Sequence, residues 1–176
     1  MISEPEVRSA GTDRLSPRMV VGVDGSDSSM RALEWAAAEA ELRGLSLLIV
    51  HVAFARREAL ESLAPGMLPA EQSLLDRAVA KAKALSPGTA VTGRICEPPT
   101  AKALISESEG AEMLVVGSRG LSGLDVLALG SVSSECARRA TCSVVVIRPP
   151  DRRSSSGAAA GRGGASTPAH PTAESG

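Results

Sequence analysis

Aromatic residues are almost absent from this chain. Trp35 and Phe54 are the only two among 176 residues, and there is no tyrosine. Proteins that bind single-stranded nucleic acid commonly stack bases on aromatic rings, so this composition argues against that class. The formal net charge of −1 argues the same way, because it leaves no basic excess for nucleic acid or for an anionic membrane surface. A core must therefore be built from valine, leucine, isoleucine and alanine.

Cysteine, histidine and long apolar runs are also scarce. The three cysteines, Cys96, Cys136 and Cys142, form no C-x-x-C pair, and His51 and His170 are the only histidines. This pattern predicts neither a zinc site nor a disulfide framework, and it fits a reducing compartment. No apolar run approaches the roughly 20 residues of a transmembrane helix, and the first residues lack the pattern of a signal peptide. We therefore expect a cytoplasmic protein with no membrane partner and no metal site of its own.

The composition divides the chain into three regions. Residues 1–17 are polar and interrupted by proline and glycine, which predicts a flexible arm. Residues 18–149 contain the apolar runs of one domain, which is long enough to enclose a core. Residues 150–176 are rich in alanine, glycine, serine and proline and have no aliphatic side chain larger than alanine. This last region cannot bury enough apolar surface to offset ordering, so we expect a disordered low-complexity tail.

Compact apolar runs rich in β-branched residues alternate with segments whose apolar residues recur at helical spacing. This alternation predicts an α/β fold, with a parallel sheet, right-handed crossovers and helices on both faces. In such sheets ligands bind beyond the carboxyl ends of the strands, where the strand order reverses. We therefore expect the glycine-bearing turns after Val23 and Val116 to lie side by side. The expected strands are residues 19–23, 45–52, 89–95, 112–116 and 143–147, and the expected helices are residues 27–43, 70–85, 98–109 and 131–139. Ser26 or Asp27 is suited to cap the first helix, and Gly44 is suited to end it. Pro65, Gly66 and Pro69 indicate a loop before the second helix.

Three glycines and a serine follow the fourth expected strand at a distinctive spacing. Gly117 and Gly120 are separated by two residues, and nine more residues lead to Gly130 and Ser131. Glycine lets backbone N–H groups approach an anion closely, and a helix start offers unpaired N–H donors and the positive end of a dipole. The spacing is neither the Walker pattern nor G-x-G-x-x-G. It indicates a phosphate site, although each glycine alone is more typical of an ordinary turn.

These blocks resemble the universal stress protein family over residues 19–148. The opening block is Val-Val-Gly-Val-Asp24-Gly-Ser26, with Trp35-Ala36 in the next helix, and the closing block is Val-Val-Val-Ile-Arg148. The glycine spacing described above is that family's ATP-binding pattern. The resemblance implies a Rossmann-like open parallel sheet of five strands in the order 3-2-1-4-5.

The resemblance also implies an adenine-nucleotide site. ATP is the expected ligand, with ADP, AMP or cyclic AMP as alternatives and Mg²⁺ as a companion of ATP. Asp24 would lie at the ribose, and the backbone of Val52 would contact adenine. The glycines, together with Ser131 and Val132, would hold the phosphates. The complete set of expected contacts is Gly22, Asp24, Val52, Val116, Gly117, Arg119, Gly120, Gly130, Ser131 and Val132.

The last expected strand, residues 143–147, is apolar and lies at the sheet edge in the implied order. An uncovered edge recruits a partner strand, and family members often pair there, so we expect a homodimer through this strand. The family pattern is broken at Cys96-Glu-Pro-Pro99, where glycine is usual after the third strand. It is also broken at Ser143, where proline is usual. The first departure affects the shape of the pocket wall, and the second affects the entry to the dimerisation strand.

Signatures of catalysis are missing. There is no G-x-S-x-G elbow, no H-E-x-x-H and no Walker lysine, and residues 24–29 resemble the loop of ATP pyrophosphatases only faintly. A receiver domain would need an aspartate and a lysine where Glu97 and Arg148 stand. We expect a stress-response or signalling module that binds ATP with little or no turnover. The alternatives are a slow ATP hydrolase and, without nucleotide, a structural dimerisation module.

Several residues have a structural interpretation beside the functional one. Asp24 is also suited to stabilising a turn or capping a helix. Arg119 is suited either to pairing with phosphate or to a solvated position. His51, between two valines of an expected strand, fits a packed structural histidine better than a catalytic base. The cysteines fit small core residues.

Overall fold

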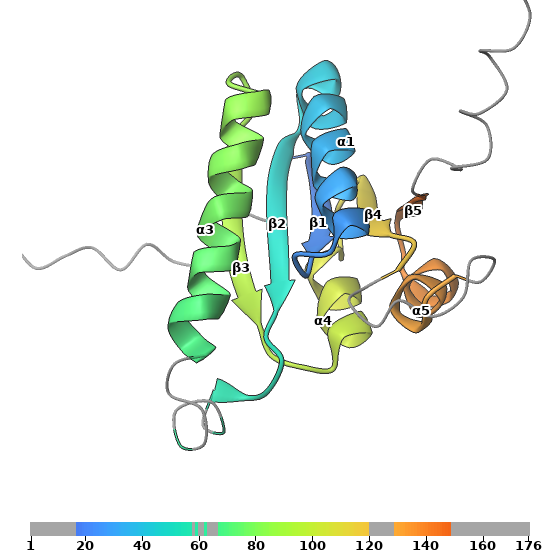
Figure 1. Ribbon diagram of the computed structural model, residues 1–176. Helices are drawn as coiled ribbons and strands as arrows, with labels where there is room; N and C mark the ends of the chain where they lie inside the picture. The colour runs from blue at the N-terminus through green and yellow to red at the C-terminus, as the bar shows by residue number, and fades with distance from the viewer. Residues whose placement is uncertain (1–16, 58, 60–61, 63–66, 120–128, 149–176) are drawn as a thin grey trace, which may run out of the picture.

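The computed structural model describes residues 17–57, 59, 62, 67–119 and 129–148 (Figure 1). The expectations for the N-terminal arm, for the C-terminal tail and for Gly120 lie outside these residues. The strands are β1 (Arg18–Val23), β2 (Ser46–Val52), β3 (Val91–Cys96), β4 (Met113–Gly117) and β5 (Ser143–Ile147). The helices are α1 (Asp27–Arg43), α3 (Met67–Leu85), α4 (Thr100–Glu107) and α5 (Ser131–Arg139).

The five strands form one parallel sheet in the order β3-β2-β1-β4-β5. The predicted fold class and strand order are therefore confirmed. Strands β2 and β3 are added in turn on one side of β1, and β4 and β5 are then added on its other side. This reversal puts the carboxyl ends of β1 and β4 next to each other, as the sequence predicts. Ligand sites of open α/β sheets form at such a reversal.

Helices cover both faces of the sheet and enclose two cores. Helices α1 and α3 lie side by side across one face, and α4 and α5 cover the other (Figure 1). In α1 the residues facing the sheet are mostly alanine, and these side chains are completely buried. Such small side chains let the helix lie close to the valines of β1. The fully buried alanines are Ala32, Ala36, Ala37 and Ala40.

The ends of α1 follow its predicted signals. The Ser26 side chain accepts a hydrogen bond from the Ser29 N–H at 3.2 Å, which satisfies one of the unpaired donors of the first turn. Gly44 ends the helix with φ of 67°, a left-handed conformation that costs glycine nothing. Ser26 therefore marks where α1 begins after β1, and Gly44 marks where α1 ends before β2.

Several predicted boundaries differ from the observed ones: the ends of β1 to β4 shift by one or two residues, and α4 ends at Glu107 rather than at residue 109. Two predicted helix starts were also wrong, and proline accounts for both. Helix α3 begins at Met67 rather than at residue 70, because Pro69 stands in its first turn, where a missing N–H breaks no helical hydrogen bond. Helix α4 begins at Thr100 rather than at residue 98, with Pro99 in extended conformation as its N-cap. Within the described residues, no helix has the length and apolar character needed to cross a bilayer.

Candidate functional site

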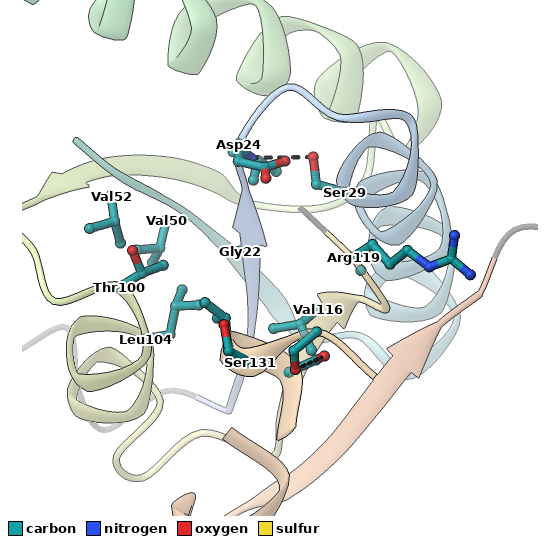
Figure 2. A pocket seen from close by; sticks show the side chains of 15 residues that line it. Gly22, Asp24, Ser29, Val50, Val52, Thr100, Leu104, Val116, Arg119 and Ser131 are labelled. Atoms are coloured by element: carbon teal, nitrogen blue, oxygen red, sulfur yellow. Dashed lines mark hydrogen bonds between the residues drawn. The ribbon is translucent and has the colours of Figure 1, made fainter. Parts of the chain in front are cut away.

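A cavity of about 360 Å³ opens at the carboxyl ends of β1 and β4. Nine of the ten predicted contact residues line it, and Gly120 lies outside the described residues. The lining comes from β1, β2 and β4, from α1, α4 and α5, and from the segments that follow β1 and β4 (Figure 2). The complete lining is Gly22, Val23, Asp24, Ser29, Val50, Val52, Thr100, Leu104, Val116, Gly117, Arg119, Gly130, Ser131, Val132 and Ser133.

The first turn of α5 provides backbone donors to the cavity. Gly130 is the N-cap, and no side chain of the described residues caps this helix. The N–H groups at the start of an α-helix have no partner within the helix, so those of Ser131, Val132 and Ser133 remain available. The Gly130 N–H donates to the Ser118 carbonyl at 2.9 Å, which anchors the helix start to the end of β4. The arrangement suits an anion at the mouth of α5.

Two of the motif glycines serve different purposes. A Cβ on Gly117 would lie 2.7 Å from the Ser28 hydroxyl and 2.8 Å from its backbone carbon, so the end of β4 touches the first turn of α1. A Cβ on Gly130 would lie 3.2 Å from the Ser118 carbonyl oxygen, a tight but less severe contact. Gly130 has φ of −61°, so close approach rather than a left-handed backbone explains the glycine. Gly117 therefore serves packing as well as the cavity.

Asp24 combines a structural contact with a place in the cavity wall. Its Oδ1 atom accepts hydrogen bonds from the Ser26 N–H at 3.0 Å and from the Ser26 hydroxyl at 2.6 Å. The Asp24 N–H donates to the Ser29 hydroxyl at 3.2 Å (Figure 2). The turn-stabilising role considered for Asp24 is thus present, and the carboxylate is held at the end of β1 with a defined orientation.

Arg119 lines the cavity, but its side chain extends away from Asp24 and Ser131 (Figure 2). Its Nε atom is buried, and no acceptor for it is found among the described residues. The guanidinium therefore stands at the rim of the cavity beside the end of β4.

The far end of the cavity is apolar and includes residues that sequence reasoning missed. Val50 and Val52 point to the same face of β2 because side chains alternate along a strand. Thr100 at the start of α4 and Leu104 of the same helix also line this part of the cavity (Figure 2). Alternation could have added Val50 to the prediction. No motif could have added Thr100 or Leu104, because only the tertiary position of α4 brings them here.

The cysteines and His51 lie outside the cavity lining. Cys136 is fully buried, and burial raises the pKa of its thiol to about 11. Burial, followed by the nearby Glu107 carboxylate, also raises the pKa of Cys96. His51 is buried and contacts Val23 and Glu71. Among the residues that the structure describes, no group of three or more histidine, cysteine, aspartate or glutamate side chains is arranged to hold a metal ion.

The profile of the universal stress protein family matches residues 16–148. The chain belongs to the universal stress protein family. Universal stress protein Rv2623 of Mycobacterium tuberculosis is 35% identical over 135 residues, which cover 74% of this chain and 44% of that protein. Universal stress protein YxiE of Bacillus subtilis is 31% identical, with 74% of this chain and 98% of that protein covered. The chain thus spans less than half of the mycobacterial relative.

A solved structure of a universal stress protein in complex with cAMP is 32% identical to this chain. It covers 76% of this chain and 97% of its own, with a TM-score of 0.60. This structural similarity is consistent with membership of the family.

Proposed function

We propose that this universal stress protein binds an adenine nucleotide, ATP in the first place, in the cavity between the ends of β1 and β4. One observation carries the proposal: contacts predicted from separate sequence blocks line a single cavity of about 360 Å³. Pockets for small ligands begin at about 300 Å³, so a nucleotide fits with part of its phosphate chain toward solvent.

The two ends of the cavity match the two ends of a nucleotide. The phosphates lie at the first turn of α5, with its backbone donors and the hydroxyl of Ser131. Gly120, outside the described residues, is proposed as a further phosphate contact from the glycine motif alone. The base lies at the apolar end, between Leu104 and the valines of β2. The ribose between them lies beside Asp24. The cAMP bound by a relative at 32% identity supports the adenine nucleotide class.

We further propose that turnover is slow or absent. The titratable side chains among the described lining residues are Asp24 and Arg119. Asp24 is held in the turn before α1, and Arg119 points along the rim, so neither is placed as a base for an attacking water. Fast phosphoryl transfer needs a positioned base and a charge-stabilising cation. Mg²⁺ would enter with ATP, held mainly by the phosphates because Asp24 is the one carboxylate among these lining residues. In the cytoplasm the protein would act as a nucleotide-dependent stress-response module.

Calorimetric titration with ATP, ADP, AMP and cyclic AMP tests the proposal. A ligand at about 100 times its dissociation constant should raise the free energy of unfolding by roughly 2.7 kcal/mol, because it binds only the folded state. Thermal melts should therefore rise with ligand concentration, and mass spectrometry should detect a nucleotide that copurifies. Melts that stay unchanged in millimolar concentrations of all four ligands would refute nucleotide binding. Product analysis after prolonged incubation separates a binding module from a slow hydrolase.

Thr100→Val should weaken nucleotide binding by about five- to tenfold, because its hydroxyl is the polar side-chain group at the apolar end of the described lining. Valine keeps the shape and removes the hydrogen bond, so affinity for inorganic triphosphate should not change. Thr100→Ser should restore most of the loss. Equal losses for nucleotide and triphosphate would place Thr100 at the phosphates instead.

We also propose a homodimer through β5. This strand occupies one edge of the sheet, and its residues Val144–Ile147 remain partly exposed although they pack on both cores. Val145→Lys would place like charges opposite each other near a two-fold axis and should favour the monomer. Sedimentation at micromolar concentration measures this. Thr92→Lys, on the exposed opposite edge, is the matched control and should remain dimeric. A wild-type protein that sediments only as a monomer would overturn the proposal.

A further inference from the structure

His51 lies directly behind the wall of the cavity. It stands on β2 between Val50 and Val52, and because side chains alternate it points to the opposite face, toward α3. The valines line the cavity, and the imidazole does not. It is only 4% exposed, and its partner Glu71 of α3 is 7% exposed. The pair cannot touch a ligand in the cavity, but it holds the backbone that forms the wall.

The hydrogen bonds of this pair require a bound proton. The His51 Nδ1 atom lies 2.8 Å from the Val23 carbonyl oxygen, which only accepts, so Nδ1 carries a hydrogen. The Nε2 atom contacts the Oε2 atom of Glu71. An unprotonated Nε2 and a carboxylate are both acceptors, so one proton must lie between them. Either the imidazolium donates to the carboxylate or the carboxylic acid donates to the imidazole, and the proton belongs to the pair.

The same pair joins two strand ends and the segment that follows β2. Val23 ends β1 and lines the cavity, and His51 binds its carbonyl. The other carboxylate oxygen of Glu71, Oε1, accepts from the Phe54 N–H at 3.1 Å, two residues beyond Val52. The hydrogen-bonded chain thus runs from β1 through β2 and α3 to the exit of β2. Loss of the proton would leave two acceptors facing each other in a buried site, which is strongly unfavourable.

We propose that His51 and Glu71 are positioning residues whose shared proton holds the ends of β1 and β2 in the nucleotide-binding arrangement, so that nucleotide binding is linked to retention of that proton. The inference rests on the proposed function, because the nucleotide is the ligand whose affinity reports the linkage. Since the protonated pair favours binding, affinity falls as pH rises through the range where the proton leaves. By reciprocity, nucleotide moves the titration of the His51 ring to higher pH.

Charged residues on the elements next to the pair, and on the segments that follow them, remain unchanged in the test below. They include Asp24 after β1, Asp27 and Arg31 in α1, Arg56 and Arg57 after β2, Asp76 in α3, and Glu97 after β3. Their effects, and the titration of the phosphates of the ligand, are common to the wild type and to a variant of the pair. A difference between the two pH profiles therefore reports the shared proton.

Glu71→Gln isolates the proton while keeping every contact. The glutamine amide donates to Nε2 of neutral His51, and its oxygen still accepts from the Phe54 N–H. The ligand is whichever of AMP, ADP, ATP and cyclic AMP binds the wild type most tightly. Its affinity is measured at a series of pH values from about 6 to about 9. We expect wild-type affinity to fall by about five- to tenfold more than that of Glu71→Gln. Glu34→Gln, at an exposed α1 carboxylate paired with Lys81, should keep the wild-type profile.

A measurement on the wild type needs no variant that might alter folding. The ¹⁵N signals of the His51 ring, assigned with a His170→Ala variant, are followed against pH with and without nucleotide. The titration should move to higher pH with nucleotide, and Nδ1 should stay protonated throughout. Identical titrations, or parallel pH profiles of wild type and Glu71→Gln, would overturn the inference while the proposed function stands. A wild type that binds none of the four nucleotides would instead overturn the proposed function.

Discussion

Ser131→Glu is expected to abolish nucleotide binding and at the same time to stabilise the protein. Ser131 is the first residue of α5, whose start has no side-chain cap among the described residues. A carboxylate there interacts favourably with the helix dipole, which is worth about 0.3–1 kcal/mol. The same carboxylate occupies the place proposed for the phosphates, where like charges repel by several kcal/mol. Affinity should fall at least about 100-fold while the melting temperature of the unliganded protein rises.

Because the affinity falls while the melting temperature rises, the loss of binding cannot be attributed to a loss of folding. Ser131→Gln has the same size without the charge, so it should lose far less affinity. High salt screens charges near the surface, so it should recover part of the loss for the glutamate variant. Titration calorimetry and thermal melts of both variants measure the two quantities. A glutamate variant with wild-type affinity would move the phosphates away from α5.

The sequence predicts the sheet well because each local signal agrees with the global fold. The β-branched runs, the Ser26 cap and the Gly44 stop all mark real boundaries. The strand order came from the family resemblance, and the sheet confirms it. Pro69 was misread as a loop residue because a proline in the first helical turn leaves the same signature as a proline outside the helix.

The candidate cavity was predictable only where its residues follow strand ends in recognisable motifs. Asp24 and Gly117 are such residues, and both line the cavity. Thr100 and Leu104 come from α4, which reaches the cavity by packing against α5 and β2. Nothing in their local sequence encodes that approach. The partnership of His51 with Glu71 was equally hidden, because it joins a strand to a helix 20 residues later.

Gly117→Val is expected to destabilise the fold itself. The added Cβ would meet the Ser28 hydroxyl at 2.7 Å, the Ser28 carbon at 2.8 Å and the Ser29 nitrogen at 2.9 Å. Two of these atoms are backbone, in the first turn of α1, and that turn is tied to Asp24 through Ser26 and Ser29. The turn cannot retreat without breaking these bonds. The free energy of unfolding should therefore fall by about 3 kcal/mol or more, a large part of the stability of an ordinary domain.

Urea unfolding followed by circular dichroism measures this loss of stability, and two other glycine variants serve as controls. Gly88→Ala places its Cβ 3.2 Å from the flexible end of the Glu41 side chain, so stability should change little. Gly130→Ala meets the Ser118 carbonyl oxygen at 3.2 Å, so it should cost modest stability but interfere with phosphate approach at α5. The two glycines of the motif would then have different roles: Gly117 would be required for the contact of β4 with α1, and Gly130 for binding the ligand. A Gly117→Val protein with wild-type stability would show that the first turn of α1 can move to accommodate the larger side chain. Ligand binding alone would then explain why glycine stands at position 117.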